Sequence, residues 1–181
     1  MTRVTPEIRC LVLDVDGVLT DGRLFVDDDG RPLRAFHVQD GFAIRWFQKL
    51  GGEVVIITGK HAQGTQRRAA ELHIRHCIQD SRDKLTDLLP LLTALRIELA
   101  QTAVIGDDLP ELGLMRRCGY PIAVANAVAE AKAAARYVTQ RAGGEGAIRE
   151  AIEHLLRADG RWDRVVEHYV AQDGIIGNRS A

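Results

Sequence analysis

The amino-acid sequence predicts an α/β fold, in which a doubly wound parallel sheet is covered by helices on both faces. Short, almost wholly apolar runs recur along the chain, which is typical of strands buried on both faces of a sheet. Segments with the 3.6-residue spacing of amphipathic helices separate these runs. No internal repeat, low-complexity tract or linker interrupts the alternation, so we expect one domain over residues 1–181.

The two patterns also give the order of the elements. The apolar runs predict strands over 8–15, 53–58, 76–79, 102–106 and 121–125. Helical spacing predicts helices over 41–50, 61–73, 83–95, 110–117 and 147–156. Pro90 is expected to kink the third helix, because proline lacks the N–H and crowds the preceding turn. Residues 160–181 are expected to form a tail, of which 172–181 fray.

The segment 23–38 does not fit this alternation. Two β-rich arms flank an Asp/Gly/Pro turn there, which predicts a β-hairpin inserted between the first strand and the first helix. Apolar residues occupy adjacent positions in the first arm (Leu24, Phe25 and Val26), so neither of its faces is cleanly polar. Because an isolated two-stranded hairpin is marginally stable, we expect it to pack on something, and another subunit is a good candidate.

Composition excludes several classes of protein. Hydrophobic residues make up 46% of the chain and charged residues 27%, which argues against disorder, collagen and coiled coil. The 24 basic and 25 acidic residues leave a net charge of −1, which disfavours a nucleic-acid partner. No apolar run approaches the 18 residues of a membrane span, and no secretory signal is evident. The three cysteines (Cys10, Cys77 and Cys118) lie far apart, which favours a reduced compartment and a cytoplasmic protein.

Ionisable and hydroxyl side chains recur where the predicted strands end. In open parallel sheets, ligands bind beyond the carboxyl ends of the strands, which lie along one edge. The residues found there are Asp14, Asp16 and Gly17 after the first strand, Thr58, Gly59 and Lys60 after the second, Lys84 after the third, and Asp107 and Asp108 after the fourth. We therefore expect carboxylates, a hydroxyl and an ammonium group to converge on one crevice.

The spacing of Asp14 and Asp16 predicts two different roles. Alternate residues on an extended backbone point to opposite faces, so a turn at Gly17 must swing the second carboxylate back toward the first. This arrangement suits a nucleophile with an acid/base partner better than two equivalent metal ligands.

The convergence of these groups indicates a phosphate ester as substrate. A carboxylate that attacks a phosphomonoester dianion meets a repulsion of about 8 kcal/mol at about 4 Å and an effective dielectric of about 20. The chemistry therefore needs a divalent cation and a lysine. Oxygen ligands suit Mg²⁺, for which Asp14 and Asp107 are natural ligands, and Lys84 supplies the fixed positive charge. Thr58 and backbone N–H groups at the strand ends can hold phosphoryl oxygens.

Competing motifs fail on their spacing. A calcium-binding EF-hand loop that starts at Asp14 would need glycine where Leu19 stands. A Walker A loop that ends at Lys60 would need glycine at Val54 and serine or threonine at His61. The histidines and cysteine of 73–77 lack a fourth zinc ligand at usable spacing.

These residues resemble the haloacid dehalogenase superfamily of phosphatases. Its motifs match in order as DVDGV at 14–18, the strand that ends in Thr58, Lys84, and GDD at 106–108. The resemblance implies that Asp14 is the nucleophile that forms an aspartyl-phosphate, and that Asp16 protonates the leaving oxygen and then activates water. It also implies that Thr58 and Lys84 bind the phosphoryl group. Mg²⁺ would lie between Asp14, the backbone carbonyl of Asp16 and Asp107, with Asp108 nearby.

A closer resemblance covers nearly the whole chain. DVDGVLTDG at 14–22, ITG at 57–59, AVANA at 123–127 and GGEGAIRE at 143–150 are similar to the subfamily that hydrolyses 3-deoxy-D-manno-octulosonate 8-phosphate in lipopolysaccharide synthesis. The resemblance implies a phosphorylated sugar acid as substrate and a haloacid dehalogenase-type fold without a cap domain. It further implies a homotetramer formed through the hairpins, with the C-terminal tail at a neighbour's active site.

Two residues depart from the subfamily's pattern and leave alternatives open. Lys60 stands where arginine is usual, so it lacks the bidentate fork for a substrate carboxylate, and Glu111 stands where aspartate is usual. Gly59, Lys60 and Arg149 are expected at the substrate, the last within a glycine-rich loop that would help to enclose it. A nine-carbon sialic-type acid 9-phosphate is the alternative substrate. A phospho-receiver switch is the alternative class, although receivers place the acidic pair and the phosphorylated aspartate in a different order.

Overall fold

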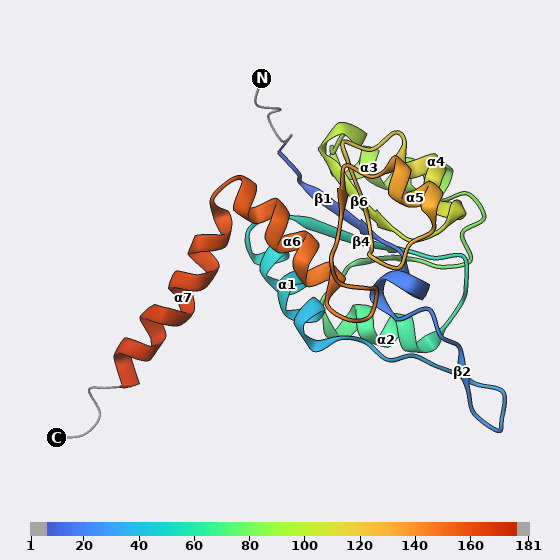
Figure 1. Cartoon of the computed structure of the whole chain (residues 1–181), viewed down its shortest axis with the longest axis horizontal. Coiled ribbons are helices and arrows are strands. Elements are labelled where there is room, and N and C mark those ends of the chain that lie inside the picture. The colour runs from blue at the N-terminus through green and yellow to red at the C-terminus, as the bar shows by residue number, and fades with distance from the viewer. Residues whose placement is uncertain (1–6, 177–181) are drawn as a thin grey trace.

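A computed structural model describes residues 7–176 of the protein. Within these residues, a six-stranded parallel sheet has the order β5-β4-β1-β6-β7-β8 (Figure 1). The strands are β1 (Cys10–Leu13), β4 (Glu53–Ile57), β5 (His76–Ile78), β6 (Thr102–Gly106), β7 (Tyr120–Ala123) and β8 (Tyr137–Val138). The two-residue β8 was not predicted, because so short a strand leaves no periodic pattern. The chain leaves β1 toward β4 on one side and later returns to β6 on the other, so the topological switch point lies between β1 and β6.

Helices cover both faces of this sheet, which is the predicted doubly wound fold (Figure 1). On one face lie α1 (Val38–Lys49), α2 (Gln63–Glu71) and α6 (Ala147–Ala158). On the other lie α3 (Lys84–Leu95), α4 (Leu112–Met115) and α5 (Ala129–Ala134). The core strands are buried on both sides, as their apolar sequences predict; all four residues of β1 are at most 1% exposed.

The helix boundaries differ from the predicted ones in several places. α1 begins at Val38, three residues earlier than predicted, and α4 is shorter, because a 3₁₀ turn occupies Leu109–Glu111. α3 continues through Pro90, and the kink expected there stays a prediction. The alanine-rich α5 was missed, because its sequence has too little contrast between faces to give an amphipathic signal.

The segment 160–181 is not simply a tail. Residues Arg161–Ile176 form α7, which projects from the sheet domain (Figure 1). Trp162 and Val165 bury one face of its first turns, and the Trp46 indole N–H donates to the Tyr169 hydroxyl at 3.2 Å. The predicted fraying of 172–181 falls partly on this helix and, from 177 onward, outside the described residues. In the part of the chain that the structure describes, no helix is long and apolar enough to cross a membrane.

The segment 23–38 contains a short hairpin that projects from the domain (Figure 1). β2 (Phe25–Val26) pairs antiparallel with β3 (Pro32–Leu33), so the paired part is only two residues long in each arm. The Asp27 carboxylate shapes the turn by accepting the N–H groups of Asp29 at 3.1 Å and Arg31 at 2.7 Å. All four paired residues are exposed, so this chain alone does not bury the apolar arms.

Candidate active site

The turn after β1 brings both of its aspartates to one cavity. Asp16 has an extended backbone, and Gly17 follows with φ +100°, a conformation that L side chains rarely adopt. The Thr20 hydroxyl fastens the turn: it donates to the Val15 carbonyl and accepts the Gly17 N–H, each at 3.2 Å. The turn therefore returns Asp16 to the side of Asp14, and both residues line a cavity of about 430 Å³.

Close packing explains why glycines surround this turn. The Asp107 carboxylate lies directly over Gly17, since a Cβ there would meet Asp107 Oδ2 at 2.1 Å. From the other side, a Cβ on Gly143 would meet the Gly17 carbonyl oxygen at 1.7 Å, and one on Gly144 would meet the Asp21 nitrogen at 2.3 Å. The glycine-rich loop at 143–146 thus supports the catalytic turn through backbone contact.

A buried lysine joins two carboxylates at the floor of the cavity. Lys84 is the first residue of α3, whose N-terminus is capped by Asp83. Its Nζ lies 2.5 Å from Asp14 Oδ1 and also pairs with Glu111 Oε1. The other oxygen of Glu111 accepts the Asp108 N–H at 3.1 Å. Lys84, Asp14 and Glu111 are all buried, so solvent screens the two ion pairs of Lys84 only weakly.

Gly106 makes room for the Glu111 side chain. A Cβ on Gly106 would meet Glu111 Cβ at 2.7 Å, so only glycine fits beside it. The Glu111 side chain pairs with Lys84 and holds the loop after β6 through the Asp108 N–H.

Burial and an excess of carboxylates over cations raise the pKa values of two carboxyl groups in the cavity, those of Asp14 and Asp107. Burial raises the pKa of Asp14 to about 6, with help from Glu111 and against the opposing effect of Lys84. Burial and the neighbouring carboxylates of Asp14, Glu111 and Asp108 raise the pKa of Asp107 to about 7. Burial alone would lower the pKa of Lys84, but Asp14 and Glu111 raise it, so the ammonium stays charged.

This excess of buried negative charge fits a divalent cation. Among the described residues, no three histidine, cysteine, aspartate or glutamate side chains gather into a complete metal-binding group. Mg²⁺ does not require one, because it is usually bound through one or two carboxylates together with waters and phosphate oxygens. Asp14 and Asp107 supply two such carboxylates on either side of the switch point.

Two cations from different loops hold the second aspartate of the turn. Arg34, from the returning arm of the hairpin, bonds both oxygens of Asp16, with Nε to Oδ1 at 3.1 Å and Nη2 to Oδ2 at 3.3 Å. Lys60 Nζ lies 3.4 Å from Asp16 Oδ2. Nothing in the sequence around Arg34 marks it as a site residue, because its contact depends on the path of the hairpin.

The end of β4 forms another wall of the cavity. The Thr58 N–H donates to the Ile78 carbonyl at 3.0 Å, and the Thr58 carbonyl accepts the Ser81 N–H at 3.1 Å. The Thr58 hydroxyl accepts the Lys60 N–H at 3.3 Å. These bonds tie the loops after β4 and β5 together beside Asp14.

The cavity gathers most of the residues that the sequence points to. Those that line it are Asp14, Asp16, Thr58, Gly59, Lys60, Lys84, Asp107 and Asp108, together with Ser81, Arg82, Pro110 and Glu111. Ser81 and Arg82 were missed, because they lie in a loop between motifs.

Arg149 is the exception, since it is not among the described residues that line the cavity. Its Nε pairs with Glu153 Oε1 at 2.5 Å. Its guanidinium lies 5.0 Å from the Phe42 ring centre and 4.8 Å from that of Trp162. Its side chain therefore joins α6 to α1 and α7 in this chain.

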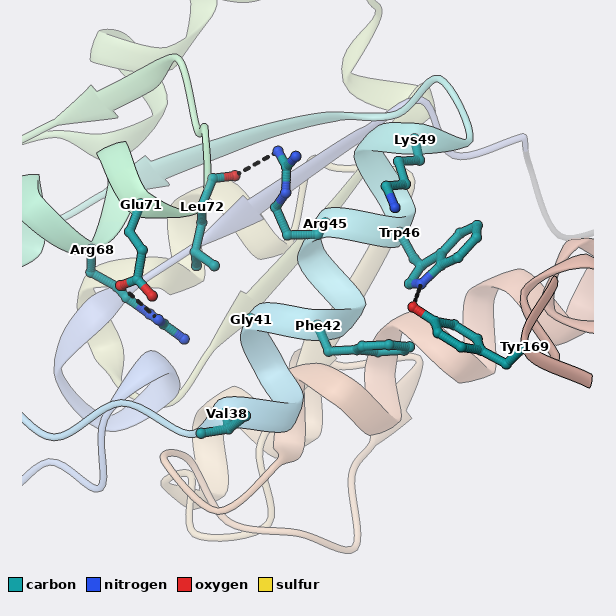
Figure 2. A pocket seen from close by; sticks show the side chains of 10 residues that line it. All are labelled: Val38, Gly41, Phe42, Arg45, Trp46, Lys49, Arg68, Glu71, Leu72 and Tyr169. Carbon is teal, nitrogen blue, oxygen red and sulfur yellow. Dashed lines mark hydrogen bonds and ion pairs between the residues drawn. The ribbon is translucent and has the colours of Figure 1, made fainter. Parts of the chain in front are cut away.

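A second cavity, of about 500 Å³, lies against the outer side of α1 (Figure 2). It is lined by Val38, Gly41, Phe42, Arg45, Trp46, Lys49, Arg68, Glu71, Leu72 and Tyr169. Its one lining carboxylate, Glu71, is paired with Arg68 at 2.9 Å, so this cavity lacks the cluster of carboxylates that phosphoryl transfer requires. We therefore place the chemistry in the smaller cavity, at the carboxyl ends of the strands.

Comparison with known proteins agrees with this geometry. Residues 77–152 match the family model of the haloacid dehalogenase-like hydrolases. The chain is 43% identical over 156 residues to the 3-deoxy-D-manno-octulosonate 8-phosphate phosphatase KdsC of Escherichia coli strain K12, covering 86% of this chain and 83% of that protein. The chain belongs to the KdsC family of haloacid dehalogenase-like phosphatases. KdsC of Yersinia pestis is 41% identical over 151 residues, or 83% of this chain and 81% of that protein.

Solved KdsC-type structures share the fold. The Moraxella catarrhalis octulosonate 8-phosphate phosphatase, in complex with a magnesium ion, a phosphate ion and KDO, superposes with a TM-score of 0.88 at 39% identity; the match covers 91% of this chain and 95% of that one. The cobalt-bound Haemophilus influenzae phosphatase gives a TM-score of 0.82 at 36% identity, covering 85% and 90%. This chain is therefore a KdsC-family phosphatase.

Proposed function

We propose that this phosphatase hydrolyses 3-deoxy-D-manno-octulosonate 8-phosphate to octulosonate and phosphate in lipopolysaccharide biosynthesis. The observation that carries the proposal is the buried Asp14–Lys84 pair beside Asp107 at the switch point of a KdsC-type fold. The magnesium ion, phosphate ion and KDO in the Moraxella relative support both the substrate class and the metal.

In the first step, a carboxylate oxygen of Asp14 attacks phosphorus. The bond from phosphorus to the 8-oxygen of the sugar breaks, and its electron pair leaves with that oxygen. Asp16 donates a proton to it, so octulosonate departs as an alcohol. Lys84, 2.5 Å from Asp14, offsets the negative charge that the nucleophile and the phosphoryl group bring together. Thr58 and the backbone at Gly59 line the wall where phosphoryl oxygens would lie.

In the second step, water attacks the phosphorus of the aspartyl-phosphate. Asp16, now a carboxylate, removes a proton from that water. The bond from phosphorus to Asp14 breaks, which releases phosphate and regenerates the nucleophile.

The metal site would be made by Asp14, Asp107 and the backbone carbonyl of Asp16, with Asp108 nearby. When bound, Mg²⁺ would neutralise part of the negative charge shared by the carboxylates and the phosphoryl group. The raised pKa values of Asp14 and Asp107 fit this assignment, because burial and the neighbouring carboxylates disfavour their ionised forms, and a bound cation would offset both effects.

Few residues of the cavity are candidates for recognising the sugar part of the substrate. Lys60 lines the cavity and, with its side chain 56% exposed, can reach a substrate carboxylate as a single point charge. A nine-carbon sugar-acid 9-phosphate is a second candidate substrate for that reason. Arg149 would act on substrate only indirectly, by holding α6 in place.

A substrate panel tests the proposal. We expect kcat/KM for octulosonate 8-phosphate to exceed that for hexose phosphates by at least about 100-fold, because the hexose phosphates lack the carboxylate. Chelation by EDTA should abolish turnover, and Mg²⁺ should restore it. A preference for the nine-carbon acid would select the second candidate, whereas a long-lived phosphoprotein without turnover would indicate a receiver switch.

We propose a cytoplasmic, single-domain enzyme without a cap, which forms a tetramer through its hairpins. The exposed apolar residues Leu24, Phe25, Val26 and Leu33 support this interface, because together they form an uncovered apolar surface.

Size measurement by light scattering tests the interface. Phe25→Lys should shift the mass from tetramer toward monomer, because it places a charge in the apolar contact. The control Leu89→Lys changes an exposed leucine on α3 and should leave the mass unchanged. A wild-type monomer would contradict the proposed assembly.

A further inference from the structure

Arg34 connects the hairpin to the catalytic turn. It follows β3 directly, and its guanidinium bonds both oxygens of Asp16, at 3.1 and 3.3 Å. Two parallel bonds from a planar fork fix the plane of the carboxylate as well as its position. Lys60 contacts Oδ2 alone, at 3.4 Å, and cannot fix the plane by itself.

The burial of Arg34 distinguishes it from the other hairpin cations. Its side chain is 6% exposed, whereas that of Arg31 is 71% exposed. Arg34 Nη1 is also buried and has no hydrogen-bond partner among the described residues. A buried N–H without a partner is locally unfavourable, and the fold tolerates it beside the two bonds to Asp16. Such local costs are typical of functional sites rather than of hairpin turns.

We infer that Arg34 is a positioning residue, which holds the Asp16 carboxyl group toward the leaving oxygen of the substrate. When Oδ2 carries the proton to be donated, Oδ1 can still accept the Arg34 Nε–H. The inference rests on the proposed role of Asp16 as general acid. The Asp16 side chain is 20% exposed and has two rotatable torsions, so the backbone turn alone does not fix its oxygens. Proton transfer needs the acid within hydrogen-bond reach of the leaving oxygen, so loss of the fork would weaken this step.

The dependence of kcat/KM on the acidity of the leaving group distinguishes the two possible roles of Arg34. A purely structural role would not change this dependence. An acidic phenol leaves as a phenolate without a proton, whereas a weakly acidic one needs help from the general acid. Removal of Arg34 should therefore slow substrates with poor leaving groups most. The quantity to compare is kcat/KM, which reports the steps up to release of the alcohol or phenol and excludes the later hydrolysis of the aspartyl-phosphate.

The test uses the full-length, Mg²⁺-loaded enzyme and a series of substituted phenyl phosphates with graded leaving-group acidity. For Arg34→Gln we expect kcat/KM to fall about 30-fold for the poorest leaving group and less than about 3-fold for the best. Arg34→Lys keeps the charge without the fork. Its kcat/KM should depend on leaving-group acidity more than that of wild type and less than that of Arg34→Gln. The matched control Arg31→Gln, on the same hairpin, should match wild type.

Asp16→Asn separates failure of this inference from failure of the proposed function. It should show the steepest dependence on the leaving group, and its thermal melt and that of Arg34→Gln should confirm folding. If Asp16→Asn shows the steep dependence but Arg34→Gln slows all substrates equally or none, Arg34 does not position the acid, and the proposed function stands. If Asp16→Asn itself lowers all rates equally, the acid role of Asp16 is wrong and the inference falls with it.

Discussion

Replacing Asp14 by asparagine is expected to lower kcat by at least about 10⁴-fold, because an amide oxygen cannot take the place of the attacking carboxylate. The measurement is steady-state phosphate release with Mg²⁺ on the preferred ester of the substrate panel. Rapid quenching should also detect no phosphoenzyme in this variant. The control Asp28→Asn makes the same chemical change on the exposed hairpin and should leave kcat unchanged.

The fold should survive this substitution. Burial is the largest cause of the raised pKa of Asp14, so the ionised carboxylate is held in an unfavourable environment in the metal-free protein. Asparagine removes that charge, and Lys84 keeps its second partner, Glu111. We expect a melting temperature, measured without metal, that is equal to or higher than that of wild type. Residual activity above a few percent in a folded variant would overturn the assignment of the nucleophile.

The placement of the site could be predicted because parallel-sheet topology makes strand ends meet. Asp14 follows β1, Thr58 follows β4 and Asp107 follows β6, and these three strands are neighbours in the sheet. Apolar runs mark the strands clearly, so the residues at their ends can be read from the sequence. Lys84 was found for the same reason, one short loop beyond β5.

Contacts that depend on the path of a loop could not be predicted in this way. Arg34 reaches Asp16 only because the hairpin folds back over the turn, and no spacing rule relates two residues 18 positions apart. Arg149 stands in a sequence motif, yet its side chain is held between Phe42 and Trp162. The sequence does not predict α7, although Trp162, Val165 and Tyr169 have helical spacing, because charged residues interrupt that pattern.

Replacing Lys84 by methionine tests the other half of the buried pair. The substitution keeps an unbranched side chain that is one atom shorter, but it leaves Asp14 and Glu111 buried without their common cation. We expect kcat/KM to fall about 10³-fold, because the charge that stabilises phosphoryl transfer is lost. We also expect the metal-free protein to lose about 3–5 kcal/mol of unfolding free energy, which is typical when one partner of a buried pair is removed.

The pH dependence of this loss has a definite sign. With Lys84 present, the pKa of Asp14 is already raised to about 6, and removal of the lysine would raise it further. An acid whose pKa is raised by folding opposes folding once it ionises, so the stability deficit should grow as pH rises from 5 to 8. Urea denaturation of wild type and variant at both pH values measures it.

A double variant separates the two effects of the lysine. Lys84→Met with Glu111→Gln removes one of the two carboxylates that pair with Lys84, and the glutamine can still accept the Asp108 N–H. This protein should regain part of the lost stability, because less charge remains unpaired, but it should regain no activity, because the ammonium beside Asp14 is still missing. If activity returned together with stability, Lys84 would serve the fold alone, and the charge that offsets the attack of Asp14 on the phosphate would have to come from elsewhere in the cavity.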